Sequence, residues 1–177
     1  MHYVICSVGH ATLIANGSFS SISFDQNQLY AAERKTKELY IFSHGDSWKK
    51  QRQFKLQYPP SVYAITIVVN GDRIIACSYG LDVIQVYSLS GQRLGTYSTS
   101  DQIVTSQLGC PFICASDADG CVLLADNYNH RLQVVGAGGK FKSMSLEPQV
   151  KRPCAAVVHE SKLYVASGED DVIVVHT

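Results

Sequence analysis

The chain has 177 residues, of which 46% are hydrophobic and 17% charged, so it can bury a core and global disorder is not expected. Its formal net charge of zero excludes a bulk electrostatic attraction to nucleic acid or membrane. The apolar runs are too short for a transmembrane helix, and the first residues lack the basic and apolar segments of a signal peptide, so a cytoplasmic location is predicted.

Two apolar runs open the chain. "YVICSV" spans residues 3–8 and "ATLIAN" spans residues 11–16, with a short break between them. Runs of this length on either side of a break predict two paired strands. Residues 1–17 are therefore expected to form a partial unit of the fold, or strands that close it.

A pattern of apolar runs then repeats four times. One run of each repeat begins at Leu29 ("LYAAE"), Ile74 ("IIACS"), Val122 ("VLLAD") or Leu163 ("LYVAS"), and another begins ten residues later in each case. The four starts are 45, 48 and 41 residues apart. Each repeat also has an apolar run upstream, and the first three continue through a glycine-containing turn into a further extended run. The pattern predicts units at 18–57, 58–105 and 106–149 and a partial unit at 150–177.

Repeats of about four antiparallel strands at this period are typical of a β-propeller. Apolar residues occupy both faces of runs such as "LQVV", as expected for a blade that is covered by a neighbour on each side. The predicted fold class is all-β: a single β-propeller domain of about four four-stranded blades, incomplete or open, as a segment of a larger propeller would be. A four-bladed ring completed by residues 1–17 is the alternative. An open arc would leave blade faces available for self-association.

Residues 111–141 carry a family resemblance. The stretch runs from Pro111 through "LLADNYNHRLQVV" to "GGKF", and its triplet Asn129-His130-Arg131 resembles the signature of the NHL repeat. The other three repeats keep the spacing but have "TKEL", "LDVI" and "DDVI" in place of "NHRL". The resemblance implies NHL-type blades, usually six in a ring, that act as recognition modules, often in tripartite-motif ubiquitin ligases. Such modules bind partner proteins or, in some members, RNA.

The turn at residues 126–131 has two interpretations. Asp126, His130 and Arg131 could form a catalytic or metal site, or the turn could be structural, with Asp126 and Asn129 bonding to nearby backbone. Polar residues recur at the position of Asp126, as Glu33, Ser78 and Ser167. Catalysis does not need four copies, so the structural interpretation is favoured.

No metal or cofactor is predicted. Cys110, Cys114 and Cys121 lack the paired spacing of a zinc site, and no histidine stands at ligand spacing to them. The six cysteines are expected to be reduced thiols.

Binding is expected at the loops that each blade presents to one rim of the propeller. The candidate residues there are Arg34, Lys35, Lys37, Tyr79, Asp82, Tyr128, His130, Arg131 and Arg152. Tyrosine and arginine are the residue types that anchor interfaces. The predicted function is non-catalytic recognition of a partner protein, as a scaffold or as the substrate-recruiting part of a ubiquitin-ligase-like protein.

Two alternatives stay open. "WKKQRQFK" (48–55) interleaves basic and aromatic residues, as single-strand binders do, so the chain could be an RNA-binding propeller. Some six-bladed propellers are metal-dependent lactonases or lyases, for which Asp25, Asp117 and His159 are the nearest candidate ligands.

Overall fold

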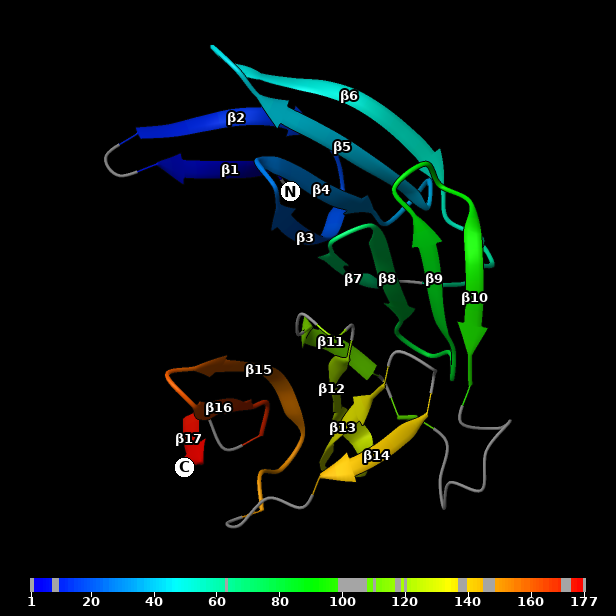
Figure 1. Cartoon of the computed structure of the whole chain (residues 1–177), viewed down its shortest axis with the longest axis vertical. Coiled ribbons are helices and arrows are strands. Elements are labelled where there is room, and N and C mark those ends of the chain that lie inside the picture. Colours follow the sequence, from blue (N-terminus) through cyan, green and yellow to red (C-terminus); the bar gives the residue numbers. More distant parts are fainter. Residues whose placement is uncertain are drawn as a thin grey trace.

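The computed structural model describes residues 2–7, 10–62, 64–98, 108–109, 111–116, 119, 121–136, 140–144, 149–169 and 173–176. Within these ranges the chain forms strands and one short 3-10 helix. The strands make antiparallel sheets that follow one another around an open arc (Figure 1). The prediction of an all-β, open propeller is confirmed.

The sheets follow the chain order. Two strands, β1 (His2–Ser7) and β2 (His10–Asn16), precede blade 1, which contains β3 (Phe19–Asp25), β4 (Gln28–Glu33), β5 (Glu38–His44) and β6 (Trp48–Lys55). Blade 2 contains β7 (Ile65–Asn70), β8 (Arg73–Ser78), β9 (Ile84–Ser88) and β10 (Arg93–Tyr97). Blade 3 contains β11 (Pro111–Ser116), β12 (Val122–Asp126), η2 (Asn127–Asn129), β13 (Arg131–Val135) and β14 (Phe141–Met144). Blade 4 contains β15 (Pro153–His159), β16 (Lys162–Ser167) and β17 (Ile173–His176).

The first strand of each blade lies on the inside of the arc, and β6, β10 and β14 lie on the outside (Figure 1). Consecutive inner strands contact one another, β3 with β7, β7 with β11 and β11 with β15. Polar side chains join them, because the Ile67 and Val69 amides donate to the hydroxyls of Ser21 and Ser23 at 3.1 and 3.0 Å. In the same way the Ile113 amide donates to Thr66 Oγ1 at 3.1 Å.

A separate apolar cluster fills each contact between blades. Leu39 and Ile41 of blade 1 pack with Ile65 and Ile74 of blade 2. A second cluster joins blade 2 to blade 3, and a third joins blade 3 to blade 4. Burial on both faces of a blade is the reason why these strands are apolar on both faces rather than alternating.

The two ends of the arc do not meet. The β1–β2 pair lies at one side of an open mouth and the β15–β17 sheet at the other (Figure 1). Ile14 and Ala15 of β2 instead pack against blade 1, on a cluster that includes Leu29 and Phe42. The alternative of a closed four-bladed ring is wrong for this structure, because β1 and β2 form a sheet of their own and do not pair with the sheet of β15, β16 and β17.

None of the described helical structure has the length and hydrophobicity that a membrane-crossing helix requires.

Candidate functional site

The carboxylate of Asp126 is the centre of a buried hydrogen-bond network. It is fully buried, and its Oδ1 accepts from the Gly109 amide at 2.6 Å and from Asn129 Nδ2 at 2.9 Å. Its Oδ2 accepts from Arg131 Nε at 2.7 Å and from Gln133 Nε2 at 2.8 Å. With donors from four residues around it, this carboxylate acts as a brace that joins the turn to β13 and to the segment that precedes β11.

The turn between β12 and β13 is a short helical turn. Residues 127–129 form the 3-10 helix η2, and the positive φ of 53° falls on His130 rather than on an asparagine. The His130 amide donates to the Asn127 carbonyl at 3.2 Å and closes this helical turn. A left-handed residue is then needed to lead the chain back into β13.

The same turn is tied to blade 4. His130 Nδ1 accepts from the Arg152 amide at 3.0 Å. Asn127 Nδ2 donates to the carbonyls of Arg152 and Pro153 at 3.0 and 3.1 Å. His130 therefore links two blades. Asn127 and Gln133 were not predicted from the sequence to take part in these contacts.

Residues at the position of Asp126 make related contacts in two other blades. Glu33 accepts from the Ser18 amide at 3.0 Å, and Ser167 Oγ donates to the Lys151 carbonyl at 2.7 Å. In both cases the bonded backbone lies just before the inner strand of the blade. In blade 2, Ser78 Oγ donates to the carbonyl of its neighbour Tyr79 at 3.2 Å.

The role of the Glu33 carboxylate can be tested through the pH dependence of stability. Burial raises the pKa of Glu33, but hydrogen bonds from Thr36 and Ser18 outweigh it and hold the pKa below 4.5. A carboxyl group whose pKa is lower in the folded state stabilises the fold at pH values above its unfolded-state pKa. This contribution is lost as the pH falls through the folded-state pKa. We expect Glu33→Gln to lose less stability than wild type between pH 5 and pH 3, measured by urea midpoints. Parallel losses in the two proteins would contradict this role.

Two exposed tyrosines and an arginine meet on the rim. Tyr79 follows β8 and Tyr128 lies in η2, and their hydroxyls are 2.7 Å apart with the rings edge to face. The Arg152 guanidinium stacks over the Tyr128 ring, 5.2 Å from its centroid. Tyr79 is 39% exposed and Tyr128 51%. Tyr79, Tyr128 and Arg152, here named the rim cluster, bring together side chains from three consecutive blades.

The remaining rim candidates are dispersed. Lys37 is buried, and its ammonium donates to the carbonyls of Arg34 and Val62, so its burial does not fit the expected surface role. Burial also lowers the pKa of Lys37. Arg34 and Lys35 are exposed in the turn of blade 1. Asp82 accepts from the Leu108 amide at 3.2 Å, which gives it a structural contact beside blade 3.

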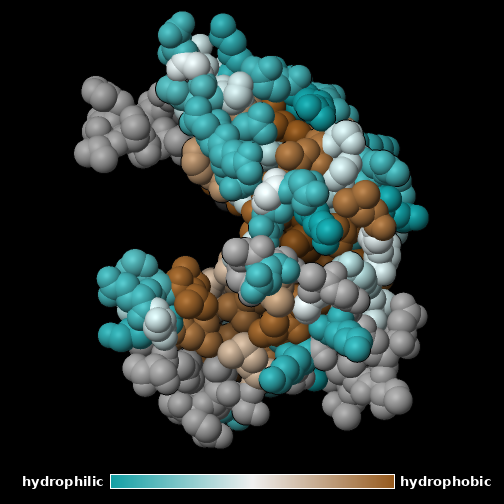
Figure 2. Space-filling model, viewed as in Figure 1, coloured by the Kyte–Doolittle hydropathy of each residue, from teal (hydrophilic) through white to brown (hydrophobic). Residues whose placement is uncertain are grey.

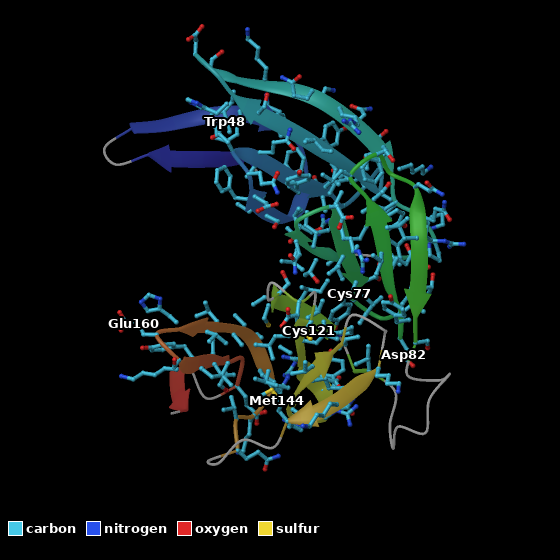
Figure 3. All side chains as sticks on the ribbon, viewed as in Figure 1. Trp48, Cys77, Asp82, Cys121, Met144 and Glu160 are labelled. Carbon is cyan, nitrogen blue, oxygen red and sulfur yellow. The ribbon has the colours of Figure 1, made fainter. Side chains whose placement is uncertain are left out.

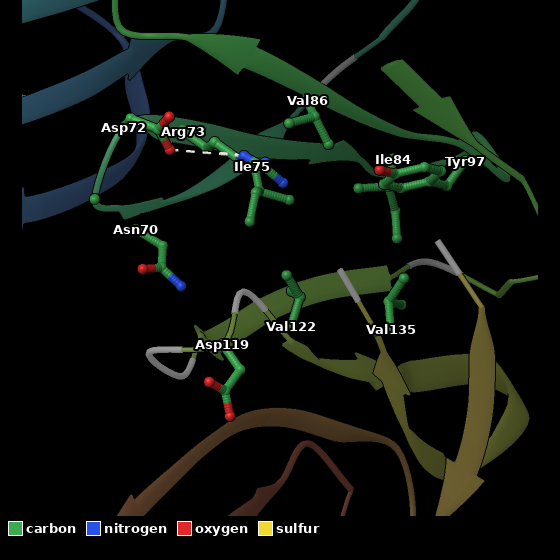
Figure 4. Close-up of a pocket in the computed structure, with 12 residues that line it drawn as sticks. Asn70, Asp72, Arg73, Ile75, Ile84, Val86, Tyr97, Asp119, Val122 and Val135 are labelled. Carbon is green, nitrogen blue, oxygen red and sulfur yellow. Dashed lines mark ion pairs between the residues drawn. The ribbon is translucent and has the colours of Figure 1, made fainter. Parts of the chain in front are cut away.

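A hollow of about 300 Å³ lies between blades 2 and 3, at the end of the blades opposite to the rim cluster. Its floor is apolar and includes Ile75, Val86 and Val122 (Figure 4). Polar residues stand at the β7–β8 turn, where the Arg73 and Asp72 side chains are 3.6 Å apart. Within the described ranges, no three potential metal ligands lie together.

The candidates for an enzyme do not converge. His159 Nε2 lies 3.8 Å from the Glu160 carboxylate, and both side chains are largely exposed. Asp25 ends β3 in a different blade, and Asp117 lies outside the described residues.

Burial disfavours the ionised form of the interior cysteines. Cys77 and Cys114 are thiols, and their burial raises the pKa to about 12 and about 11 respectively. Protonated thiols in such surroundings behave as small apolar side chains. Cys110 lies outside the described residues.

The basic run "WKKQRQFK" forms β6, the exposed outer strand of blade 1 (Figure 3 shows Trp48 at its start). Lys50 lies 5.1 Å from the centroid of the Tyr40 ring and donates to Gln53 at 2.8 Å. Arg52 donates to the Leu89 carbonyl of blade 2 at 3.1 Å. Two of its basic side chains therefore already have contacts within the protein.

No family model and no curated protein matches the chain. Several solved structures share its fold. A protein of unknown function from Bacteroides thetaiotaomicron is 13% identical with a TM-score of 0.73, and the match covers 92% of this chain and 49% of that one. A streptogramin B lyase is 13% identical with a TM-score of 0.69, over 89% of this chain and 50% of the lyase. The WD40 β-propeller domain of Doa1 is 14% identical with a TM-score of 0.65, over 93% of this chain and 52% of that one.

The chain thus spans about half the length of these structures. Identities this low show the fold alone, because propellers with the same architecture have unrelated activities. The NHL resemblance of residues 111–141 stays a prediction. The chain is a β-propeller that forms an open arc.

Proposed function

We propose that this chain is a non-catalytic recognition module that binds a partner protein through the rim cluster. The observation that carries the proposal is the meeting of Tyr79, Tyr128 and Arg152 on one exposed surface built by three blades. Tyrosine and arginine are enriched among the residues that dominate binding energies. On the NHL resemblance, this role is that of a substrate-recruiting part of a ubiquitin-ligase-like protein in the cytoplasm.

The support beneath the rim cluster favours a preorganised surface. Gly109 packs so closely that an added Cβ would lie 2.8 Å from Tyr128 Cβ. The Tyr128 amide donates to the Gly109 carbonyl at 2.9 Å, and the Gly109 amide donates to Asp126. Little side-chain or loop entropy is then lost on binding, which is how rigid surfaces gain affinity.

The side chains of the rim cluster indicate the chemical character of the partner. Two phenol rings offer apolar area with hydroxyls at the edge, and a tyrosine orders few torsions on binding. A guanidinium beside them favours a carboxylate or carbonyl group. We infer that the partner presents an extended peptide segment with apolar residues next to an acidic one.

Selection of binders from a displayed peptide library on the immobilised chain tests the proposal. We expect the enriched peptides to carry this pattern, and Tyr79→Ala and Tyr128→Ala each to weaken binding by roughly tenfold or more, as substitutions of anchor residues do. Isothermal titration calorimetry with a synthetic enriched peptide measures the loss.

The matched control is Leu94→Ala. Its side chain is 52% exposed and lies on the outer strand β10, not in one of the turns that hold the rim cluster. All three variants are expected to keep the free energy of unfolding of the wild type within about 0.5 kcal/mol, as surface substitutions do. Peptides that bind the tyrosine variants as tightly as the wild type would place recognition elsewhere.

The exposed basic side chains of β6 support a second candidate, RNA binding. A salt-dependent gel shift with single-stranded RNA, abolished by Lys49→Glu together with Lys55→Glu, would favour it over peptide recognition. The lyase among the structures of similar fold supports an enzyme only at the level of fold, and no described group of residues favours it.

A further inference from the structure

Two apolar side chains of β3 are exposed where their counterparts in blade 2 are buried. Ile22 pairs with Ala31 and Phe24 with Leu29, just as Ile67 pairs with Ala76 and Val69 with Ile74. Ile22 and Phe24 are 47% and 62% exposed, whereas Ile67 and Val69 are 4% and 7% exposed. The face of β3 that carries Ile22 and Phe24 is therefore equivalent to the face of β7 that the preceding blade covers.

The covering of blade 1 is partial. Ile14 and Ala15 of β2 pack on the cluster that contains Leu29, Ala31 and Phe42, which belong to β4 and β5. Ser21 and Ser23 point to blade 2, since their hydroxyls accept from its amides. Ile22 and Phe24 alternate with them and so lie on the opposite face, next to the mouth of the arc. This exposed part of β3 is the β3 end face.

The complementary surface stands on the other side of the mouth. Ala156 and Val165 of blade 4 pack on blade 3, so the alternating residues Ala155, Val157 and Tyr164 face away from it. Val157 is 52% exposed, and Ala155 is exposed as well. Figure 2 shows apolar surface along this arm of the mouth. These three residues form the β15 end face.

We propose that a second copy of this chain closes the ring, with the β15 end face of each copy packed on the β3 end face of the other. Three contacts between consecutive inner strands already exist within the chain, at β3–β7, β7–β11 and β11–β15. The two end faces are apolar and belong to the first and last inner strands, so they fit the same contact. The proposal does not depend on the proposed function of the rim cluster.

Length and symmetry favour a closed pair. The chain covers about half of three of the solved structures of the same fold, so two copies hold about as many residues as one of these three. A head-to-tail contact that repeats twice around a two-fold axis leaves neither face exposed, whereas a non-closing arrangement would grow into a filament. Exposed apolar faces of this kind mark interaction sites.

Light scattering coupled to size exclusion tests the proposal. The wild-type chain is expected at twice its mass of 19.4 kDa. Phe24→Lys and Val157→Asp are each expected to yield monomers, because either change places a charge in both contacts of the pair. Mixing the two variants is expected to restore a dimer, in which one contact joins Lys to Asp and the other keeps Phe24 on Val157. A contact of like faces would not be repaired by mixing.

The control is Leu94→Asp on the outer strand β10, which is expected to stay dimeric. Circular dichroism verifies that every variant is folded, and Ile22→Lys replaces Phe24→Lys if the latter is not. A monomeric wild-type chain, a mass that keeps growing with concentration, or a mixture that stays monomeric would each overturn the proposal.

Discussion

Asp126→Ala is expected to lower the free energy of unfolding by about 3–5 kcal/mol, the cost of removing one member of a buried, hydrogen-bonded charge pair. The Asp126 carboxylate is fully buried and receives hydrogen bonds from Gly109, Asn129, Arg131 and Gln133. Without it, those donors lose the acceptor that they share, and Arg131 loses its ion pair with Asp126. Urea midpoints at neutral pH measure the loss.

The matched control is Asp72→Ala, which removes a carboxylate that is 89% exposed and 3.6 Å from the Arg73 guanidinium. Because exposed ion pairs contribute little, a change of about 0.5 kcal/mol or less is expected there. If Asp126→Ala unfolds like wild type while binding of an enriched peptide collapses, Asp126 belongs to a binding site and its bracing role is wrong.

Tyr87→Ala is expected to cost about 3–5 kcal/mol, as the removal of a fully buried aromatic ring does. The ring belongs to the cluster between blades 1 and 2 and is completely buried. Its hydroxyl accepts from the Gln57 amide at 2.8 Å and donates to Gln85. Tyr87 therefore holds the segment between the two blades as well as filling their contact.

Tyr87→Phe separates these two contributions. It keeps the ring but leaves the Gln57 amide without an acceptor, at an expected cost of about 1–3 kcal/mol. Tyr128→Phe is the control, since it removes a hydroxyl from a ring that is 51% exposed and should change the urea midpoint little. Equal losses for Tyr87→Phe and Tyr128→Phe would show that the hydroxyl of Tyr87 does not hold the linking segment.

The fold could be predicted from the sequence because each blade repeats the same spacing. The second and third strands of the four units pair in the structure, from Leu29 with Phe42 to Leu163 with His176. Apolar residues on both strand faces correctly indicated blades covered on both sides. Local pattern sufficed here, since neighbouring strands in sequence are also neighbours in each sheet.

The contacts between blades could not be predicted in this way. His130 bonds to Arg152, which is 22 residues away in the sequence, and no local spacing predicts that bond. Lys37 reads as a surface charge in "RKTKEL", yet tertiary packing turns its ammonium inward to two carbonyls. The sequence did contain one sign of the buried polar contacts. Glutamine stands second in both "IQVY" and "LQVV", and Gln85 and Gln133 are both buried and hydrogen-bonded.

The separate apolar cluster at each blade contact has a consequence for how the chain tolerates change. Each blade draws its stability from itself and its immediate neighbours, as in other linear arrays of repeats. Within one chain, a harmful substitution in blade 4 affects blade 3 more than blade 1, because the apolar clusters of blades 1 and 4 have no described residue in common. Blades 2 and 3, which have a neighbouring blade on each side within the chain, are therefore expected to form its most cooperative part.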